Sequence, residues 1–363
     1  MRIFIDGHML KQAHGGVSRV WRETLGRVIA QCPGYDFTLY LTDRARRGAP
    51  ASPRVRRIIE WGLPPRALFT AISHWQARRV QADIFHSTYY TDPLTAARRI
   101  VVTVYDFNHE RLPGVTGSTH MIEKKRACIQ RADALIAISE ATKNDLVEIC
   151  RVPPEKVTVM PLACNETFAH TPTLPDEIAA FAAQHRLRQP YWLYVGRRGT
   201  YKNFTTLLKA FAAVAGETGA SLVVAGGRAE LETHEIQLLI ESRIEDRVVL
   251  LPGISDEALR VAYAGAAAFI FPSLAEGFGL PVIEAMGCGC PVIASDIPVF
   301  REVAGDAALF FDPHDPAALA DMMRRSLDSS VRTPLASAGR KRAADFSWDK
   351  SATILRGVYE SLA

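Results

Sequence analysis

The chain has 363 residues, of which 48% are hydrophobic and 23% are charged, with a net charge of +4. This composition is that of a folded globular protein, so a disordered or collagen-like chain is excluded, and the length predicts two domains. No apolar run approaches the roughly 18 residues of a membrane-spanning helix, and residues 1–10 lack the pattern of a signal peptide, so we expect a cytoplasmic protein.

The two halves of the chain differ in charge. Residues 1–165 hold 24 Lys+Arg and 15 Asp+Glu, a net +9, whereas residues 166–363 hold 19 and 24, a net −5. A basic half favours an anionic partner such as a membrane surface, a lipid diphosphate or nucleic acid. RNA-binding aromatic motifs are absent and the basic residues are spread over several segments, so we expect no nucleic-acid partner.

Strand-like and helix-like segments alternate through the first half. The apolar runs typical of strands buried on both faces of a parallel sheet are residues 2–6, 36–41, 83–86, 100–106, 132–139 and 156–161. Helices are predicted at 17–31, after the Gly15-Gly16 turn, and at 66–82, where the apolar residues are Leu68, Ile72, Trp75 and Val80. Ser139 is placed to cap the next helix.

Residues 165–177 are polar and contain prolines, so we predict a linker there. The alternation then resumes, with strands at 191–196, 221–227, 247–253, 267–273, 291–295 and 307–313 and helices at 203–215, 230–243, 256–265, 279–287, 315–327 and 334–345. Two successive βα repeats predict an α/β fold of two doubly wound, Rossmann-like domains that face one cleft, with ligands at the carboxyl ends of the strands.

The sharpest chemical signal is the segment EGFGLPVIE, in which Glu276 and Glu284 bracket seven residues. Its glycines follow a predicted strand and open a helix, where backbone N–H groups can hold phosphate or sugar oxygens. Glu284 would lie about two turns into that helix, where a carboxylate can accept two hydrogen bonds from a ribose diol. The alternative is that the two glutamates are solvated side chains around a tight turn. The surrounding sequence, FPSLAEGFGLPVIEAMGCGCPVIAS, argues against that alternative.

With these motifs the chain resembles the family 4 glycosyltransferases, which have the GT-B fold and retain anomeric configuration. Besides the E-x7-E motif, the matching segments are GGVSR (15–19), RADALIAISEATKNDL (131–146), YVGRRGTYKNF (194–204), VAGG (224–227), LPGISDEAL (251–259), IPVFREVAG (297–305) and FSW…Y (346–359). The resemblance implies an acceptor-binding domain at 1–167, a nucleotide-sugar-binding domain at 168–345, and a C-terminal helix at 346–363 that crosses back onto the first domain.

The resemblance also implies roles for the residues of the donor site. Arg197 and Lys202 would neutralise the diphosphate, whose charge grows as the sugar leaves, with Arg198 as the other candidate. Glu276 would contact hydroxyls of the donor sugar, and Glu284 would hold the ribose. The backbone is expected to contribute the phosphate contacts and the base pocket, through Gly277, Phe278, Gly279 and Leu280, through Gly15 and Gly16 of the first domain, and through Pro252, Gly253 and Ile254.

One position departs from the family pattern. Many relatives end the central strand of the first domain in His-Asp, but here Tyr105 precedes Asp106. A histidine that contacts the donor sugar is therefore absent at that place. Three residues could take over its role, namely Tyr105 itself, His109 in the following loop, and His86 after another strand.

The reaction expected from the resemblance is transfer of a hexose with retention, in which the acceptor hydroxyl attacks from the face that the diphosphate leaves. No D-x-D sequence occurs and the six cysteines form no C-x-x-C pair, so we expect no metal and no cofactor. Both glycine pairs around the motif lack the third glycine of a dinucleotide fingerprint, which argues against a hydride-transfer enzyme.

GDP-mannose is the first choice of donor, because the YKNF segment is similar to that of mannosyltransferases of surface-polysaccharide and lipopolysaccharide O-antigen assembly. UDP-glucose, UDP-galactose and a nucleotide-activated deoxysugar such as rhamnose stay open. The acceptor would be a glycan or a lipid-linked saccharide. The basic first domain favours a lipid-linked or membrane-proximal acceptor, because it could make peripheral contact with an anionic membrane. Other readings are a sucrose- or trehalose-type synthase and a non-catalytic glycosyltransferase-like or basic-surface binding protein.

Overall fold

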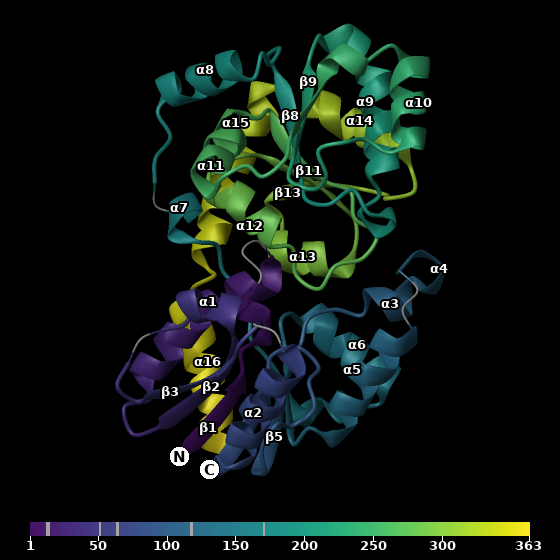
Figure 1. Ribbon diagram of the computed structural model, residues 1–363. Helices are drawn as coiled ribbons and strands as arrows, with labels where there is room; N and C mark the ends of the chain where they lie inside the picture. Colours follow the sequence, from purple (N-terminus) through teal and green to yellow (C-terminus); the bar gives the residue numbers. More distant parts are fainter. Residues whose placement is uncertain (12–14, 51, 63–64, 117–118, 170) are drawn as a thin grey trace. The chain divides into compact units, whose positions relative to one another are not determined.

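The computed structural model of the chain describes residues 1–363 with the exception of 12–14, 51, 63–64, 117–118 and 170 (Figure 1). It also leaves out the side chains of 11, 46–48 and 115–116. Its contacts divide the chain into two compact units. Unit 1 comprises Met1–Glu110, Ser118–Leu162 and Ser347–Ala363, and unit 2 comprises Arg111–Gly117 and Ala163–Phe346.

Unit 1 contains a seven-stranded parallel sheet in the order β3-β2-β1-β4-β5-β6-β7. Its strands are β1 (Arg2–Asp6), β2 (Asp36–Thr42), β3 (Val55–Glu60), β4 (Ala82–Ser87), β5 (Ala97–Val104), β6 (Ala134–Ala137) and β7 (Val157–Val159). The direction of strand progression reverses between β1 and β4. In open α/β sheets such a switch point leaves a crevice at the carboxyl ends of the strands.

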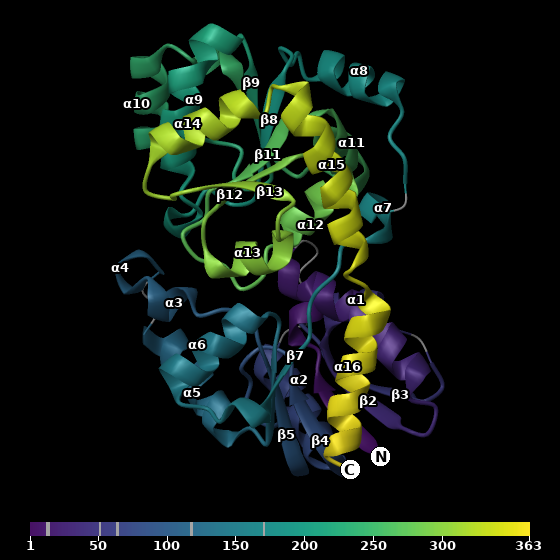
Figure 2. The same cartoon turned by 180° about the vertical axis from the view of Figure 1, so that it is seen from behind.

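Helices cover this sheet. They are α1 (Gly16–Gln31), α2 (Arg66–Arg78), α3 (Asn108–Arg111), α5 (Thr119–Arg131), α6 (Glu140–Cys150) and α16 (Trp348–Ser361), with 3-10 turns η1 (His8–Lys11), η2 (Asp43–Gly48) and η3 (Pro154–Lys156). The predicted cap is confirmed, because the Ser139 hydroxyl accepts a hydrogen bond from the backbone N–H of Thr142 at 3.0 Å. The C-terminal helix α16 belongs to unit 1 and lies beside α1 (Figures 1 and 2).

Unit 2 contains a six-stranded parallel sheet in the order β10-β9-β8-β11-β12-β13, which reverses direction between β8 and β11. Its strands are β8 (Tyr191–Val195), β9 (Ser221–Ala225), β10 (Val248–Leu251), β11 (Ala268–Phe271), β12 (Val292–Ser295) and β13 (Ala308–Phe311). Most of their residues are fully buried, because helices shield both faces of a parallel sheet.

The remaining elements of unit 2 are helical. They are α4 (Pro113–Thr116), α7 (Glu166–Ala169), α8 (Pro175–Gln184), η4 (Thr200–Lys202), α9 (Phe204–Thr218), α10 (Thr233–Ser242), η5 (Glu245–Arg247), α11 (Asp256–Gly265), α12 (Leu280–Gly287), α13 (Pro298–Ala304), α14 (Pro316–Arg325) and α15 (Ser329–Ala344). In the described part of the chain, no helix is both long and apolar enough to cross a membrane.

Three of the differences between the sequence prediction and the structure have a clear physical explanation. The helix predicted at 66–82 ends at Arg78, and strand β4 begins at Ala82. The linker predicted at 165–177 contains α7 and the start of α8, because short helices tolerate the polar and proline residues that suggested a loop. Strand β3 was missed because it lies at the edge of the sheet, where exposed Arg56 and Arg57 interrupt its apolar pattern.

Candidate active site

The loops that follow β8, β9 and β10 are joined through their backbones at the carboxyl edge of the second sheet. The N–H of Gly196 donates to the carbonyl of Ala225 at 2.9 Å, and the N–H of Gly226 donates to that of Leu251 at 3.0 Å. At Gly227 the backbone has φ +73°, and a Cβ atom would lie 3.0 Å from the Gly196 carbonyl oxygen. Only glycine allows this approach, which sets the path of the loop ahead of Lys202.

Lys202 and Glu276 form an ion pair across the switch point of unit 2. Lys202 belongs to η4, after β8, and Glu276 lies in the loop after β11. Their side chains are 15% and 13% exposed, so the pair is largely shielded from water while still reachable. A hydrogen bond of 2.8 Å from the Leu274 N–H to the Tyr201 carbonyl ties the two loops together. Lys202 and Glu276 therefore meet in the structure, although they lie far apart in the sequence.

The end of η4 is fixed just after Lys202. Asn203 adopts the left-handed conformation, with φ +56°. Its amide donates to the Pro313 carbonyl at 2.7 Å, and its side-chain oxygen accepts from the Thr206 hydroxyl at 2.7 Å. These contacts of Asn203 fix the backbone next to Lys202, so the position from which the Lys202 side chain projects is preorganised.

The two adjacent arginines have different environments. The guanidinium of Arg198 lies 3.2 Å from the Glu235 carboxylate, both side chains are buried, and it also donates to the carbonyls of Arg228 and Glu230. The charge of Arg198 therefore anchors the segment after β9, and its contact with the donor stays a prediction. Arg197 is exposed, and its carbonyl accepts a hydrogen bond from the Tyr194 hydroxyl at 2.7 Å.

The glycine-rich loop leads directly into α12. Gly279 precedes that helix with φ +104°, where an added Cβ would lie 3.0 Å from the ring of Phe300. The first turn of α12 receives no side-chain cap, so its N-terminus suits an anion. The Phe278 ring is 2% exposed and packs edge-on against Phe346 at 5.7 Å, which leaves its backbone for any ligand contact.

The other predicted donor residues lie on the same edge of the second sheet. Glu284 is in the second turn of α12 and is 4% exposed, so its carboxylate is held inside the fold. Gly277 and Leu280 are buried in the loop and at the helix start. Pro252, Gly253 and Ile254 follow β10, with the first two exposed.

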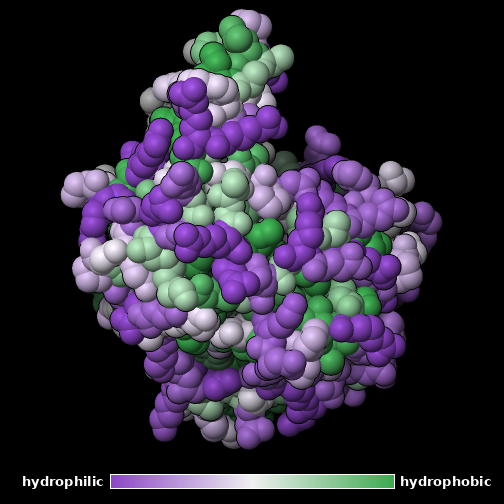
Figure 3. All heavy atoms as spheres, turned by 90° about the horizontal axis from the view of Figure 1, so that it is seen from below, coloured by the Kyte–Doolittle hydropathy of each residue, from purple (hydrophilic) through white to green (hydrophobic). Residues whose placement is uncertain are grey.

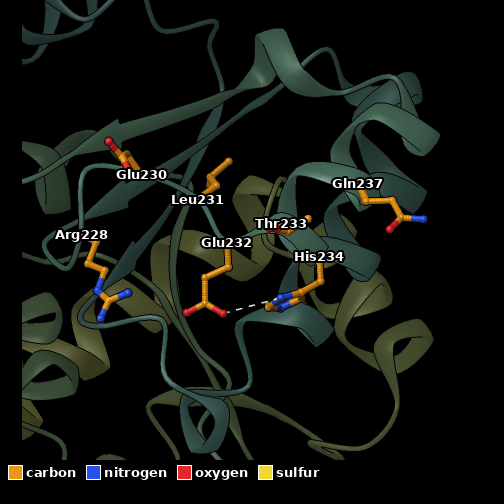
Figure 4. Close-up of a pocket in the computed structure, with 7 residues that line it drawn as sticks. All are labelled: Arg228, Glu230, Leu231, Glu232, Thr233, His234 and Gln237. Carbon is orange, nitrogen blue, oxygen red and sulfur yellow. Dashed lines mark ion pairs between the residues drawn. The ribbon is translucent and has the colours of Figure 1, made fainter.

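A hollow of about 560 Å³ lies beside these loops, in the segment that joins β9 to α10 (Figure 4). It is lined by Arg228, Glu230, Leu231, Glu232, Thr233, His234 and Gln237. The Glu232 carboxylate and the His234 ring lie 3.6 Å apart on one side of it (Figure 4). The carbonyls of Arg228 and Glu230, which accept hydrogen bonds from Arg198, belong to this segment. The buried Arg198 side chain therefore helps to shape the hollow. The predicted donor residues are not among the lining residues.

In unit 1 the structure corrects two candidates for the missing histidine. Tyr105 is 4% exposed, and its hydroxyl accepts from the Trp21 indole at 2.6 Å. His86 is fully buried, with ring nitrogens 2.7 Å from the Tyr359 hydroxyl and 2.9 Å from the Thr103 hydroxyl. Burial lowers the pKa of His86 to about 3 and raises that of Tyr105. Both side chains are therefore packing residues.

Asp106 and His109 lie in the loop after β5 and the short helix α3, where both are partly exposed. Beneath them is a buried ion pair that the sequence did not reveal. The Lys125 ammonium lies 2.9 Å from the Glu110 carboxylate and donates to the Asp106 carbonyl at 2.8 Å. Their side chains are 1% and 4% exposed, so this pair fixes the loop from inside.

A second unpredicted cluster lies at the switch point of unit 1. The buried carboxylate of Asp6, at the end of β1, lies 2.6 Å from the His8 ring and accepts from the Thr91 hydroxyl at 2.6 Å. The other ring nitrogen of His8 lies 3.3 Å from Glu60. Burial raises the pKa of Glu60, but the hydrogen bond from Thr70 and the charge of His8 outweigh it and lower that pKa. The His8 side chain is 28% exposed, so it can reach a ligand.

The predicted phosphate contact of unit 1 lies at the start of α1. Gly15 has extended backbone and is exposed, and α1 begins at Gly16 without a side-chain cap. Such a terminus offers backbone donors to an anion that comes close to it.

Two Rossmann-like units, each with a parallel sheet, are the architecture of the GT-B fold, to which many glycosyltransferases belong. The family model described as Glycosyltransferase Family 4 matches residues 14–168, and that described as Glycosyl transferases group 1 matches residues 176–343. The chain belongs to the family 4 glycosyltransferases.

Two O-antigen mannosyltransferases are similar in sequence to the chain. The chain is 29% identical to O-antigen chain mannosyltransferase B of Escherichia coli, over 79% of this chain and 77% of that protein. It is 28% identical to O-antigen chain mannosyltransferase RfbU of Salmonella typhimurium, over 67% of this chain and 66% of that protein. Sucrose-phosphate synthase from Thermosynechococcus elongatus has a similar fold, with a TM-score of 0.77 and 22% identity over 100% of this chain and 99% of that one.

Proposed function

We propose that the protein transfers a hexose, with retention of configuration, from a nucleotide sugar to a glycan or lipid-linked saccharide in the assembly of a surface polysaccharide such as an O-antigen. GDP-mannose is the proposed donor, supported by the mannosyltransferases among its relatives. The observation that carries the proposal is the shielded pair of Lys202 and Glu276 at the switch point of unit 2.

In this proposal the donor separates the ion pair. The diphosphate takes the ammonium of Lys202, with Arg197 beside it, while Glu276 turns to hydroxyls of the sugar. A fixed cation stabilises the charge that develops on the diphosphate as the bond to the anomeric carbon breaks. The N-terminus of α12 offers further donors to the phosphates, and Glu284 holds the ribose.

The acceptor step needs no further group in this proposal. The acceptor oxygen bonds to the anomeric carbon on the face that the diphosphate leaves, and a phosphate oxygen receives the hydroxyl proton. We assign the acceptor to the carboxyl edge of unit 1, where Asp106, His109 and His8 are partly exposed. The net charge of +9 over residues 1–165 supports an acceptor at an anionic membrane.

The first experiment is a thermal shift series with GDP, UDP, dTDP and ADP without metal. A ligand that binds the folded state raises the melting temperature according to its concentration relative to its Kd, so the ranking reports the base. A shift with GDP alone is expected. A shift with UDP or dTDP instead would replace the donor with a glucose, galactose or rhamnose derivative, and no shift with any nucleotide would overturn the assigned donor site.

Two assays test the reaction itself. NMR of the product should show the same anomeric configuration as the donor, and an inverted anomer would refute retention. Activity should survive EDTA. Loss of activity in EDTA that magnesium or manganese restores would contradict the proposal that the enzyme works without a metal.

A further inference from the structure

Helix α2 presents its large apolar side chains outward. Leu68, Ile72 and Trp75 are 54%, 42% and 54% exposed. Their spacing of four and three residues places them on one face of the helix. The buried residues of the same helix are Ser73 and Ala77. The side chains that α2 buries fully are therefore small, with Phe69 and His74 partly buried beside them, which reverses the usual arrangement of a surface helix.

Hydrogen bonds hold α2 in this orientation. The Ser73 and Tyr40 hydroxyls lie 2.8 Å apart, and the Thr70 hydroxyl donates to the Glu60 carboxylate at 2.7 Å. The Tyr40 hydroxyl lies 3.2 Å from the same carboxylate. Rotation of the helix to bury its apolar stripe would break these bonds, so the stripe stays outward.

The charged side chains of the helix itself, and of Arg79 directly after it, are all basic. Arg66, Arg78 and Arg79 are exposed, and the guanidinium of Arg79 stacks 4.0 Å from the centre of the Trp75 ring. The helix contains no Asp or Glu. An apolar stripe with tryptophan, flanked by arginines and free of carboxylates, has the chemistry of a helix that lies in the interface of an anionic bilayer.

A comparison within the molecule shows that exposure alone does not give this pattern. Ile236 and Ile240 on α10 are 44% and 56% exposed, also one turn apart. That helix carries glutamates at 235 and 241 and no lysine or arginine. In the view of Figure 3, hydrophobic residues appear as separate groups on a mostly hydrophilic surface.

We propose that Leu68, Ile72, Trp75 and Arg79, the α2 face, dock on the surface of an anionic lipid bilayer. This inference rests on the membrane-proximal acceptor of the proposed function and names the segment that makes the contact. A second copy of the chain is the poorer occupant. A stable interface buries about 800 Å² per partner, more than three side chains supply, and a two-fold contact would bring the arginines of both copies together.

The experiment is co-sedimentation of the full chain with vesicles of phosphatidylcholine alone and of phosphatidylcholine with phosphatidylglycerol. We expect the wild type to bind the anionic vesicles and to release them as salt shortens the Debye length. L68S/I72S should lower the partition coefficient at least about tenfold, because it removes the apolar area that inserts. I236S/I240S is the matched control and should bind as the wild type does. R78Q/R79Q should weaken binding about fivefold for each arginine lost.

Tryptophan fluorescence gives a readout at the face itself. Trp75 is exposed and Trp61 is partly exposed, whereas Trp21, Trp192 and Trp348 are buried. In a Trp61→Phe background, anionic vesicles should shift the emission to shorter wavelength, and Trp75→Phe should abolish that shift while it preserves co-sedimentation. A shift that persists in this variant would place the contact elsewhere and overturn the assignment.

The remaining outcomes separate this inference from the proposed function. If L68S/I72S binds vesicles as well as the wild type does, the α2 face is refuted while membrane contact stands. If the wild type ignores anionic vesicles, both the α2 face and the membrane-proximal acceptor fail, whereas the GDP-induced thermal shift still reports on the donor site. If gel filtration without lipid shows a wild-type dimer that L68S/I72S dissociates, the face is a protein interface and the proposal is overturned.

Discussion

Lys202→Met and Glu276→Gln should have opposite effects on nucleotide binding. Each variant breaks the same ion pair, whose side chains are 15% and 13% exposed. Loss of a pair at this depth should cost about 1–3 kcal/mol of unfolding free energy, between the values for surface and fully buried pairs. Both variants should therefore melt several degrees lower than the wild type, by similar amounts.

Nucleotide affinity then distinguishes the two partners. Lys202→Met removes a charge-assisted contact to the diphosphate, worth about 1.5–3 kcal/mol, so the Kd for GDP should rise about tenfold or more. Glu276→Gln removes a carboxylate that competes for the ammonium, so the Kd for GDP should stay the same or fall. Turnover should fall by about 10²–10³ in both variants, because each loses a contact made in the transition state.

The assay pairs calorimetric titration of GDP with initial rates on the donor that the thermal shift series identifies. Lys202→Arg keeps the positive charge and serves as the control for its loss. If Glu276→Gln weakens GDP binding as much as Lys202→Met does, the donor does not separate the pair, and the assigned exchange of partners is refuted. Turnover near that of the wild type in either variant would remove that residue from the active site.

Three further predictions follow from the site and its supports. Arg198→Met leaves the buried Glu235 carboxylate unpaired and should destabilise the protein by about 3–5 kcal/mol in chemical denaturation, with GDP affinity of the folded protein unchanged; a specific loss of GDP affinity would support its donor role. The pKa of His86 is lowered from 6.5 to about 3 in the folded state, so His86 binds its proton mainly in the unfolded state. The free energy of unfolding should therefore fall as the pH drops from about 6.5 to about 3. In denaturation measured across this range, His86→Gln should flatten that slope by up to about 1.4 kcal/mol per pH unit. Gly279→Ala should cost about 1–3 kcal/mol and impair turnover because φ there is +104°, whereas Gly26→Ala, with no atom near its added methyl group, should leave turnover unchanged in the same assays.

The donor site is predicted at the carboxyl edge of the second sheet, and the structure places the proposed residues of unit 2 at that edge. Its side chains lie in short loops directly after predicted strands, and the carboxyl ends of parallel strands meet at one edge of a sheet. The family resemblance assigned Lys202 and Glu276 to this site, and the structure adds that their side chains form an ion pair. The same reasoning could not separate Arg197 from Arg198, because neighbours in a loop project differently and only the packing of α10 decides which one is buried.

Burial explains what the sequence missed in unit 1. His86 lies near the carboxyl end of β4, where ligand-binding residues are often found, but its ring is buried against Tyr359, 273 positions later in the chain. The exposed stripe of α2 was taken only as the apolar pattern of a helix, since periodicity does not say which face the tertiary structure covers. The Lys125–Glu110 pair gave no signal either, because no motif singles out these two residues and charged residues are generally expected to face solvent.

The strand order of each sheet gives a physical reason for where charged side chains gather. In unit 2 the order reverses between β8 and β11, so the loops after these strands turn to opposite sides, and Lys202 and Glu276 meet above the gap. In unit 1 the reversal lies between β1 and β4, where Asp6 and His8 form their pair and Thr91 closes it from the β4 side. A buried carboxylate paired with a partly exposed imidazole is suited to hydrogen bonding with hydroxyl groups. The chemistry of the second switch point thus matches a diphosphate sugar, and that of the first matches a saccharide acceptor.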